Sequence, residues 1–203
     1  MQRKYWTVIF LLFLSLTSQQ VRGQMGDKMV PHLGFMYEIV DLKDPIQNDL
    51  SRVFYTFSLG TYYTLGHKND VVSVGVDPSV NFGFNLVSNV TGSETGLNLV
   101  VQVPVFLMGR FGANATKYNQ QKFGVGAGIG GVYTFFREGI VKQRSSAINP
   151  SAVAEITFMS GGGPLTIRAH VSLFNPTATL TFPSGSVDFN EFRTIGFGLI
   201  YGL

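Results

Sequence analysis

The fragment RAHVSLFN carries the two side chains of this sequence that most suggest catalysis, His170 and Ser172. A serine becomes a nucleophile when a base lies within hydrogen-bond reach and an acid orients that base. The downstream acid considered for this role is Glu191. Residues two apart in an extended chain share a face, but this spacing is common in strands, and a histidine held by hydrogen bonds is the simpler interpretation. We expect no catalytic residues here.

Two other kinds of site have less support. Residues 126–131 match G-x-G-x-x-G, which binds a pyrophosphate when a strand precedes it and a helix follows it. The residues that follow, VYTFFREGIVKQRSS, are rich in β-branched and aromatic types and have no helical period, so the helix is not predicted. The three histidines, His32, His67 and His170, lack the spacing of metal ligands. We expect neither a cofactor site nor a metal site.

The elements that would position these residues are strands. Apolar residues recur at alternate positions, which is the period of a chain whose successive side chains point to opposite faces. Each run is long enough to cross a bilayer as a tilted strand of about 9–11 residues. The predicted strands cover residues 31–41, 52–65, 71–87, 96–110, 122–136, 151–160, 164–174 and 192–203. Pro78 and Pro104 interrupt two of them and are expected to mark bulges or strand ends, because proline cannot donate to a strand ladder.

The two faces of the predicted strands differ in composition. One face is apolar, as in the series Val72, Val74 and Val76. The other is rich in Gly, Ser and Asn and poor in charge, whereas the water-facing side of a soluble sheet carries many Lys and Glu. This second face suits the packed interior of an eight-stranded barrel, which has just enough room for side chains. It also holds large residues: Phe54, Tyr62, Phe106, Met108 and Phe174.

The fragment KFGVGAGIGGVYTFF shows this division most clearly. Glycines occupy positions 124, 126, 128 and 130, and apolar residues occupy the positions between them. We expect the glycines to face inward, where positions without a side chain make space for Phe106, Met108 and Tyr62 of neighbouring strands. The residues expected to face lipid are Phe123, Val125, Ala127 and Ile129.

Ionisable side chains on the predicted inner face form the candidate site. Burying a charge in a narrow barrel costs several kcal/mol per ion unless the charge is paired. Structural ion pairs are therefore the first interpretation of this group, and a gate or constriction for small solutes is the second. The group consists of Glu38, Asp77, Arg110, Glu155, Arg168 and His170.

The start of the chain predicts export. Arg3 and Lys4 precede an apolar run, and small and polar residues follow it, which is the order of a secretory signal peptide. The run is too short for a membrane-spanning helix. We expect residues 1–23 to be the signal peptide, with cleavage near 18–24, and residues 24–203 to form one domain. The chain has no cysteine, which excludes a lipid-modified cysteine and a disulfide framework.

The formal net charge of +3 does not indicate nucleic-acid binding. The predicted leader holds three of the 15 basic residues and none of the 12 acidic residues, so its removal leaves 12 of each. The remaining Lys and Arg are scattered rather than clustered, so no phosphate-binding patch is predicted. We expect no nucleic-acid partner.

The connections and the C-terminus support a barrel. The gaps between predicted strands are alternately long and short, as in outer-membrane barrels with extracellular loops and short periplasmic turns, although residues 111–121 are longer than such a turn. The chain ends FRTIGFGLIYGL, with an apolar residue at every second position. These residues are Ile195, Phe197, Leu199, Tyr201 and Leu203.

This ending resembles the C-terminal insertion signal of outer-membrane β-barrels, whose last residue is usually Phe rather than Leu. With VPVFLMGRFG and KFGVGAGIGGVY, the mature chain resembles the small outer-membrane β-barrel domain family of Bacteroidetes-type bacteria, similar in plan to the OmpA transmembrane domain and OmpX. The resemblance implies an all-β, eight-stranded antiparallel up-and-down transmembrane barrel in a Gram-negative outer membrane. Its implied partners are outer-membrane lipid and, through the C-terminal strand, the barrel-assembly machinery.

The family specifies architecture better than function, because it includes adhesins and secretion accessories. We expect a structural or interaction role through extracellular loops near 42–51, 88–95, 137–150 and 175–191, with a largely plugged lumen and no enzymatic activity. The alternatives are a narrow, porin-like pore for small solutes and a soluble periplasmic barrel that binds an apolar ligand. His170 and Ser172 are similar to the His-x-Ser of lipid A deacylases, but those enzymes turn this motif toward lipid and follow it with Asn, where this chain has Leu173.

Overall fold

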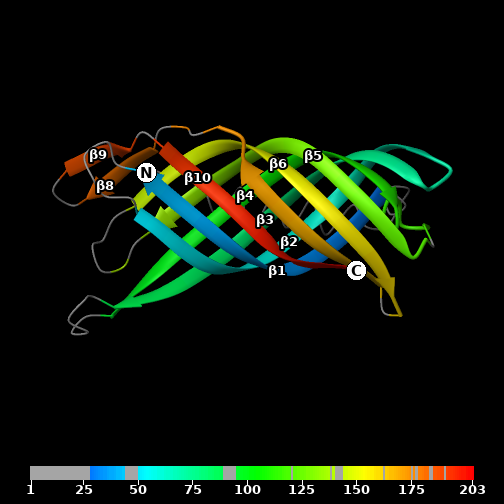
Figure 1. The fold of residues 1–203 in the computed structure, drawn as a ribbon, viewed down its shortest axis with the longest axis horizontal. Coiled ribbons are helices and arrows are strands. Elements are labelled where there is room, and N and C mark those ends of the chain that lie inside the picture. Colours follow the sequence, from blue (N-terminus) through cyan, green and yellow to red (C-terminus); the bar gives the residue numbers. More distant parts are fainter. Residues whose placement is uncertain are drawn as a thin grey trace, which may run out of the picture.

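Eight strands close into a barrel, which confirms the predicted all-β, antiparallel up-and-down fold (Figure 1). The computed structural model describes residues 28–43, 50–88, 95–119, 121–137, 139, 144–161, 163–174, 176, 178–182, 185–189 and 191–203. The signal peptide expected at 1–23 lies outside these residues. No helix in the described part of the chain is long and apolar enough to cross a membrane.

The barrel strands follow one another in chain order around the wall. They are β1 (Met29–Lys43), β2 (Leu50–Lys68), β3 (Val72–Ser88), β4 (Thr95–Gly112), β5 (Phe123–Arg137), β6 (Arg144–Ser160), β7 (Gly163–Ser172) and β10 (Glu191–Gly202). Each pairs antiparallel with the next, and β10 pairs with both β7 and β1. The last strand therefore closes the sheet on the first.

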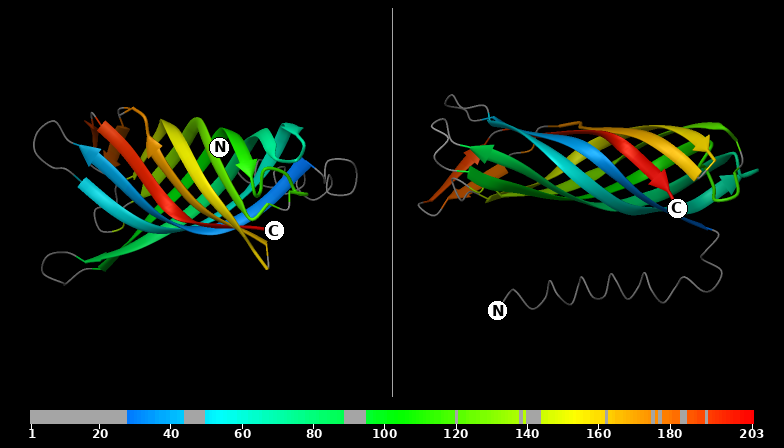
Figure 2. Two further views of the ribbon diagram at one scale, coloured as in Figure 1. Left: turned by 45° about the vertical axis from the view of Figure 1, so that its right-hand side comes forward. Right: turned by 90° about the horizontal axis from the view of Figure 1, so that it is seen from below.

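The two ends of the barrel differ. At one end, here called the turn end, β2 meets β3, β4 meets β5 and β6 meets β7, and both Met29 and Gly202 lie there. At the other, the loop end, a hairpin of β8 (Ala178–Phe182) and β9 (Gly185–Phe189) extends the wall, because β8 pairs with residues 144–146 of β6. Both views of Figure 2 show this orange hairpin at the end away from the C-terminus.

The sequence did not predict the full length of this part of the wall. β6 begins at Arg144 rather than at residue 151, because β5 continues to Arg137 and offers its edge up to that point. The hairpin β8–β9 lies in the stretch 175–191, which we predicted as a loop. Its strands are five residues each, too short to show a period, and β8 also pairs with β6, a partner far away in the sequence.

The expectation for Pro78 and Pro104 was wrong, because both lie inside strands and neither marks a bulge. The pairs between β3 and β4 pass from Pro78 with Val105 to Asn81 with Gln102 in the same register, and the positions between them are unpaired. Pro104 falls in this gap. A second gap lies beside Pro78 on its β2 side, between the pairs of Gly60 and Tyr63. Since proline has no N–H to donate, the ladder is interrupted on one side of each proline, toward β2 at Pro78 and toward β3 at Pro104.

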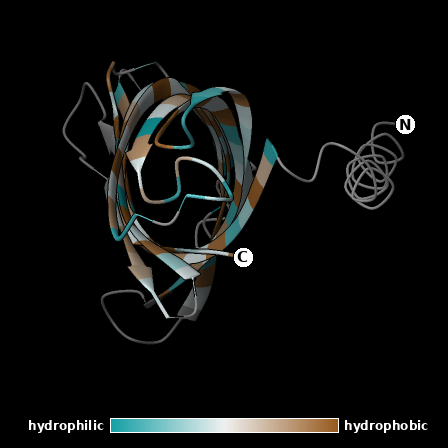
Figure 3. Ribbon diagram, turned by 90° about the vertical axis from the view of Figure 1, so that its right-hand side faces the viewer, coloured by the Kyte–Doolittle hydropathy of each residue, from teal (hydrophilic) through white to brown (hydrophobic). Residues whose placement is uncertain are grey.

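The side chains alternate between the two faces of the wall as predicted. Figure 3 shows hydrophilic and hydrophobic positions alternating along the strands. Ile129 is 63% exposed on the outside, whereas Phe54, Tyr62 and Phe106 are fully buried on the inside. The placement of Phe174 was wrong: β7 ends at Ser172, and Phe174 is 68% exposed beyond it.

The connection between β4 and β5 packs against the turn end. Ala113 and Ala115 are buried, and the side chains of Thr116 and Asn119 donate to the backbone oxygen of Asp70, at 3.4 and 2.6 Å. Asp70 lies in the connection between β2 and β3. Figure 3, which looks into the barrel from this end, shows a connection lying across its mouth; the other turns at this end have three residues or fewer. The extra length of residues 111–121 therefore forms a cover.

Candidate functional site

Four charged side chains meet inside the barrel as a central ion cluster: Asp77, Arg110, Glu155 and Arg168. Each guanidinium group bridges both carboxylates. Arg110 donates from Nη2 to Asp77 Oδ2 at 3.0 Å and from Nε to Glu155 Oε2 at 3.0 Å. Arg168 donates from Nε to Glu155 Oε1 at 2.6 Å and from Nη2 to Asp77 Oδ2 at 2.5 Å. None of the four is more than 4% exposed, so each charge depends on its partners for stabilisation.

The central ion cluster joins opposite walls of the barrel. In the closed ring of eight strands, β3 and β7 are four strands apart in both directions. The pair of Asp77 on β3 and Arg168 on β7 therefore spans the lumen. On the β2 side the guanidinium carbon of Arg110 lies 4.0 Å from the centre of the Tyr62 ring. The cluster thus reaches from one wall of the barrel to the opposite wall.

A second polar group lies closer to the loop end. His170 Nε2 is 3.0 Å from Glu38 Oε2, and both side chains are at least 97% buried. The Asn81 amide donates to Glu38 Oε1 at 3.4 Å and to Gln102 Oε1 at 3.2 Å. These contacts link β1, β3, β4 and β7 across the lumen.

Glycines allow these pairs to form across an intervening strand. Arg110 and Glu155 both pair in register with Gly126, which lies between them on β5. Glu38 and His170 both pair in register with Gly196, which lies between them on β10. A Cβ at Gly196 would lie 2.5 Å from both Glu38 Oε2 and His170 Nε2, closer than real Cβ contacts allow. Each pair therefore needs a position without a side chain beneath it.

Apolar side chains fill the lumen on both sides of this polar region. The Phe54 and Phe136 rings meet edge to face at the loop end, with centroids 5.7 Å apart. The loop-end apolar cluster consists of Val40, Phe54, Val100, Phe136, Ala147, Ala178 and Phe192. A second cluster, beside the central ion cluster, consists of Val30, Tyr62, Phe106, Met108, Val132 and Val153.

The structure places the six residues of the candidate site together on the inward face. Four form the central ion cluster, and Glu38 and His170 form a separate pair. The five C-terminal residues lie on the outward face. Leu203 follows β10, and its backbone N–H donates to Pro31 O at 2.9 Å. The outward residues are Ile195, Phe197, Leu199, Tyr201 and Leu203.

His170 and Ser172 do not contact each other through any hydrogen bond of the described residues. His170 bonds to Glu38, whereas Ser172 Oγ lies 3.1 Å from Thr194 Oγ1 and accepts from the Thr194 backbone N–H at 2.9 Å. A serine nucleophile needs its base within hydrogen-bond reach, so the geometry offers no activated serine here. Among the described residues, no group of three His, Asp or Glu could hold a metal ion.

Sequence reasoning missed several members of this interior. His32 Nε2 lies 3.6 Å from Asp77 Oδ1, and His32 pairs in register with Gly60, so it joins the central ion cluster from β1. Phe136 and Phe192 were not identified as interior residues. All three positions follow from strand parity, since each lies an even number of residues from an inward neighbour on its own strand.

No protein-family model and no curated protein matches this chain. Among solved structures, Neisserial surface protein A superposes with a TM-score of 0.51 at 8% identity, over 87% of this chain and 96% of that one. Ail, the attachment invasion locus protein of Yersinia pestis, gives 0.45 at 12% identity, over 87% and 99%. The outer membrane protein AlkL gives 0.48 at 12% identity, over 87% and 90%. The likeness to Neisserial surface protein A confirms, for the fold alone, the resemblance to small outer-membrane barrels.

We predict that Gly196→Ala destabilises the barrel by about 1–3 kcal/mol, because the added methyl group collides with Glu38 and His170. Gly131→Ala is the matched control: its Cβ would meet no atom closer than 3.9 Å, and we expect a change within about 0.5 kcal/mol. Urea unfolding of each variant in lipid vesicles measures both values. Equal stability of the two variants would show that Gly196 is not needed for the pair above it.

Arg168→Met should destabilise the protein by about 3–5 kcal/mol, because it leaves Asp77 and Glu155 with a single guanidinium partner. Arg137→Met removes an arginine that is exposed at the loop end and should cost at most about 1 kcal/mol. Both variants can be compared by the temperature at which the folded band disappears in unheated gel samples. A larger loss for Arg137→Met would contradict a stabilising role of the central ion cluster.

Proposed function

We propose that this protein is an outer-membrane β-barrel that acts through contacts made at its loop end, and neither passes solutes nor catalyses a reaction. The observation that carries this proposal is the set of side-chain contacts inside the lumen. The central ion cluster connects β3 with β7 through Asp77 and Arg168, and the loop-end apolar cluster lies between it and the outside. Because side chains occupy the interior, the surfaces that remain for contacts with other molecules are the outer wall and the two ends of the barrel.

The outer wall supports insertion in a bilayer. Exposed Phe, Leu, Ile and Val residues cover it, and on β5 the aromatic residues Phe123 and Tyr133 lie ten positions apart. At about 3.3 Å per residue and a tilt of about 40°, ten residues span about 25 Å, the height of the apolar band of outer-membrane barrels. The outward charged residues lie toward the strand ends: Asp41, Lys68, Arg137, Arg144 and Arg193.

The same distribution argues against the soluble ligand-binding alternative. That alternative requires the Phe, Val and Leu series to line an internal cavity. Phe35, Leu86 and Ile129 are instead 63–74% exposed on the outside, and the inward face carries the ionised and amide side chains. A soluble barrel with this wall would expose a continuous apolar surface to water, which monomeric soluble proteins avoid.

A narrow pore is the second candidate, because some interior hydroxyl groups have no protein partner. Ser58, Ser79 and Thr134 are buried, and their side-chain oxygens make no hydrogen bond within the described residues. Buried hydroxyl groups usually bond to water when protein offers no partner. Hydration of this kind is compatible with a closed lumen, but it also favours a path for small solutes.

The loop end offers the surface for an interaction. The hairpin β8–β9 pairs with β6 beyond the end of β7, so the wall is extended on this side of β6. Arg137 and Arg144 pair in register at the loop end and are both exposed, so two guanidinium groups lie side by side on this rim. Lipid around the wall and assembly by a barrel-insertion machinery that reads the C-terminal strand remain part of the proposal.

Cysteine labelling tests the proposed orientation, because the native chain has no cysteine. Ser186→Cys, on β9 at the loop end, should react with a membrane-impermeant maleimide in intact cells. Gly161→Cys, exposed at the turn end, should react only after the outer membrane has been permeabilised. If only Gly161→Cys reacts in intact cells, the orientation is the reverse of the proposed one. If neither variant reacts, the proposed exposure at the cell surface is wrong.

Insertion can be tested by placing a charge in the outward band. Ile129→Lys should lower the free energy of unfolding from vesicles by about 2–4 kcal/mol, because Ile129 lies between the two aromatic positions of β5. Phe174→Lys, at a similarly exposed site beyond the end of β7, should change it by less than about 1 kcal/mol. Similar small effects at both sites would contradict a lipid-facing wall.

Planar-bilayer recordings separate the two candidate functions. With the interior filled as described, we expect purified protein to insert without discrete conductance steps. Arg168→Met removes one of the contacts that span the lumen, so it serves as a variant in which steps are more easily detected. Reproducible steps from the unmodified protein would favour the narrow pore.

A further inference from the structure

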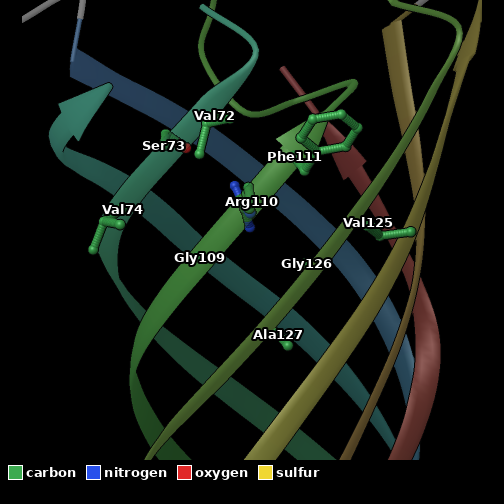
Figure 4. A pocket seen from close by; sticks show the side chains of 9 residues that line it. All are labelled: Val72, Ser73, Val74, Gly109, Arg110, Phe111, Val125, Gly126 and Ala127. Carbon is green, nitrogen blue, oxygen red and sulfur yellow. The ribbon is translucent and has the colours of Figure 1, made fainter. Parts of the chain in front are cut away.

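The outer wall has a groove near the turn end that the proposed function does not use. It crosses β3, β4 and β5 and has a volume of about 380 Å³. Figure 4 shows its floor at Gly109 and Ala127, which have no side chain or a short one, and the larger side chains around them. The surrounding apolar side chains are those of Val72, Val74, Phe111 and Val125.

The groove follows from the strand register. Val74 pairs with Gly109, and Gly109 pairs with Ala127, so a row of small outward residues begins at β4. A Cβ at Gly109 would meet no atom within 4 Å, whereas Phe111, one row nearer the turn end, is 54% exposed. The groove is therefore a depression about one side chain deep in an otherwise protruding apolar wall.

Positive charge lies at the turn-end rim of this groove. Lys68 pairs in register with Val72, which lines the groove, and shares its outward face. Lys122 is exposed immediately before β5 begins. The described acid nearest to them in sequence is Asp70, whose carboxylate accepts from Thr116 at 3.3 Å and lies 3.3 Å from His67. The rim is thus positive where the wall passes from lipid to water.

We propose that this groove binds an anionic phospholipid, with one acyl chain over Gly109 and Ala127 and the phosphate held by Lys68 and Lys122. An acyl chain is apolar and narrow, so it fits a depression one residue row wide, and contact of its methylene groups with the side chains of Val74, Phe111 and Val125 is favourable. Lysine is a common phosphate partner at membrane surfaces. The inference rests on the proposed insertion in a membrane and adds a lipid preference to it.

A second copy of this chain fits the groove less well. Two barrels packed through this face would bring Lys68 and Lys122 of each copy close to those of the other, and like charges repel. The walls of the groove also protrude at Phe111 and Val74, so a second barrel would touch the rim rather than the floor. A single lipid chain reaches the floor without this conflict.

The test is retention of lipid by the purified protein. Vesicles of equal parts phosphatidylglycerol and phosphatidylcholine are loaded with protein, recovered by flotation, and the released protein is weighed by native mass spectrometry. We expect the unmodified protein to retain phosphatidylglycerol at least threefold over phosphatidylcholine. Gly109→Leu fills the groove and should reduce the retained phosphatidylglycerol at least threefold.

Two controls separate the groove from the general lipid belt. Gly131→Leu makes the same substitution at an outward glycine of β5 that does not line the groove, and should retain lipid as the unmodified protein does. Lys68→Gln with Lys122→Gln should abolish the preference for phosphatidylglycerol, whereas Arg137→Gln with Arg144→Gln at the loop end should not. Faster migration of unheated samples confirms that each variant is folded.

The outcomes are distinct. Equal retention in Gly109→Leu and Gly131→Leu, or a lipid ratio unaffected by the lysine substitutions, overturns the site while leaving membrane insertion in place. Protein that does not float with the vesicles overturns the proposed insertion and the lipid site together. A preference for phosphatidylglycerol that requires both Gly109 and the two lysines supports the proposal.

Discussion

The width of this barrel limits which side chains can meet in its interior. Eight strands enclose just enough space for side chains, so two large inward residues can meet over a strand only where that strand has no side chain. Gly126 beneath Arg110 and Glu155 meets this condition, and so does Gly196 beneath Glu38 and His170. The alternating glycines are therefore part of the arrangement of charge, because they decide which ionic groups can touch.

This arrangement also explains how two arginines are tolerated in the interior of the barrel. Each guanidinium group of the central ion cluster contacts both Asp77 and Glu155, so each charge has two opposite neighbours. Removing one member leaves its partners buried with fewer contacts, and this makes the pairing specific as well as stabilising. The barrel is then tied across its diameter by ionic contacts as well as around its circumference by the strand ladder.

The alternation of residues along the strands predicted much of this molecule, but not which charged side chains contact one another. The number of barrel strands, the outward apolar face and the inward position of Glu38, Arg168 and their companions all follow from alternate residues in the sequence. The partners do not, because Asp77 meets Arg168 only after eight strands close in a particular register. The β8–β9 hairpin and the early start of β6 were not predicted for the same reason. Both depend on the edge of another strand, which the local sequence does not reveal.

The gaps beside Pro78 and Pro104 give the wall a mechanical character of its own. Along β3 the ladder lacks pairs toward both β2 and β4 within the same few residues. Hydrogen bonds between strands resist sliding and bending, and regions with fewer of them open at lower cost. The barrel thus has one compliant seam in an otherwise stiff cylinder, and lateral pressure on its wall would change the shape of its cross-section there first.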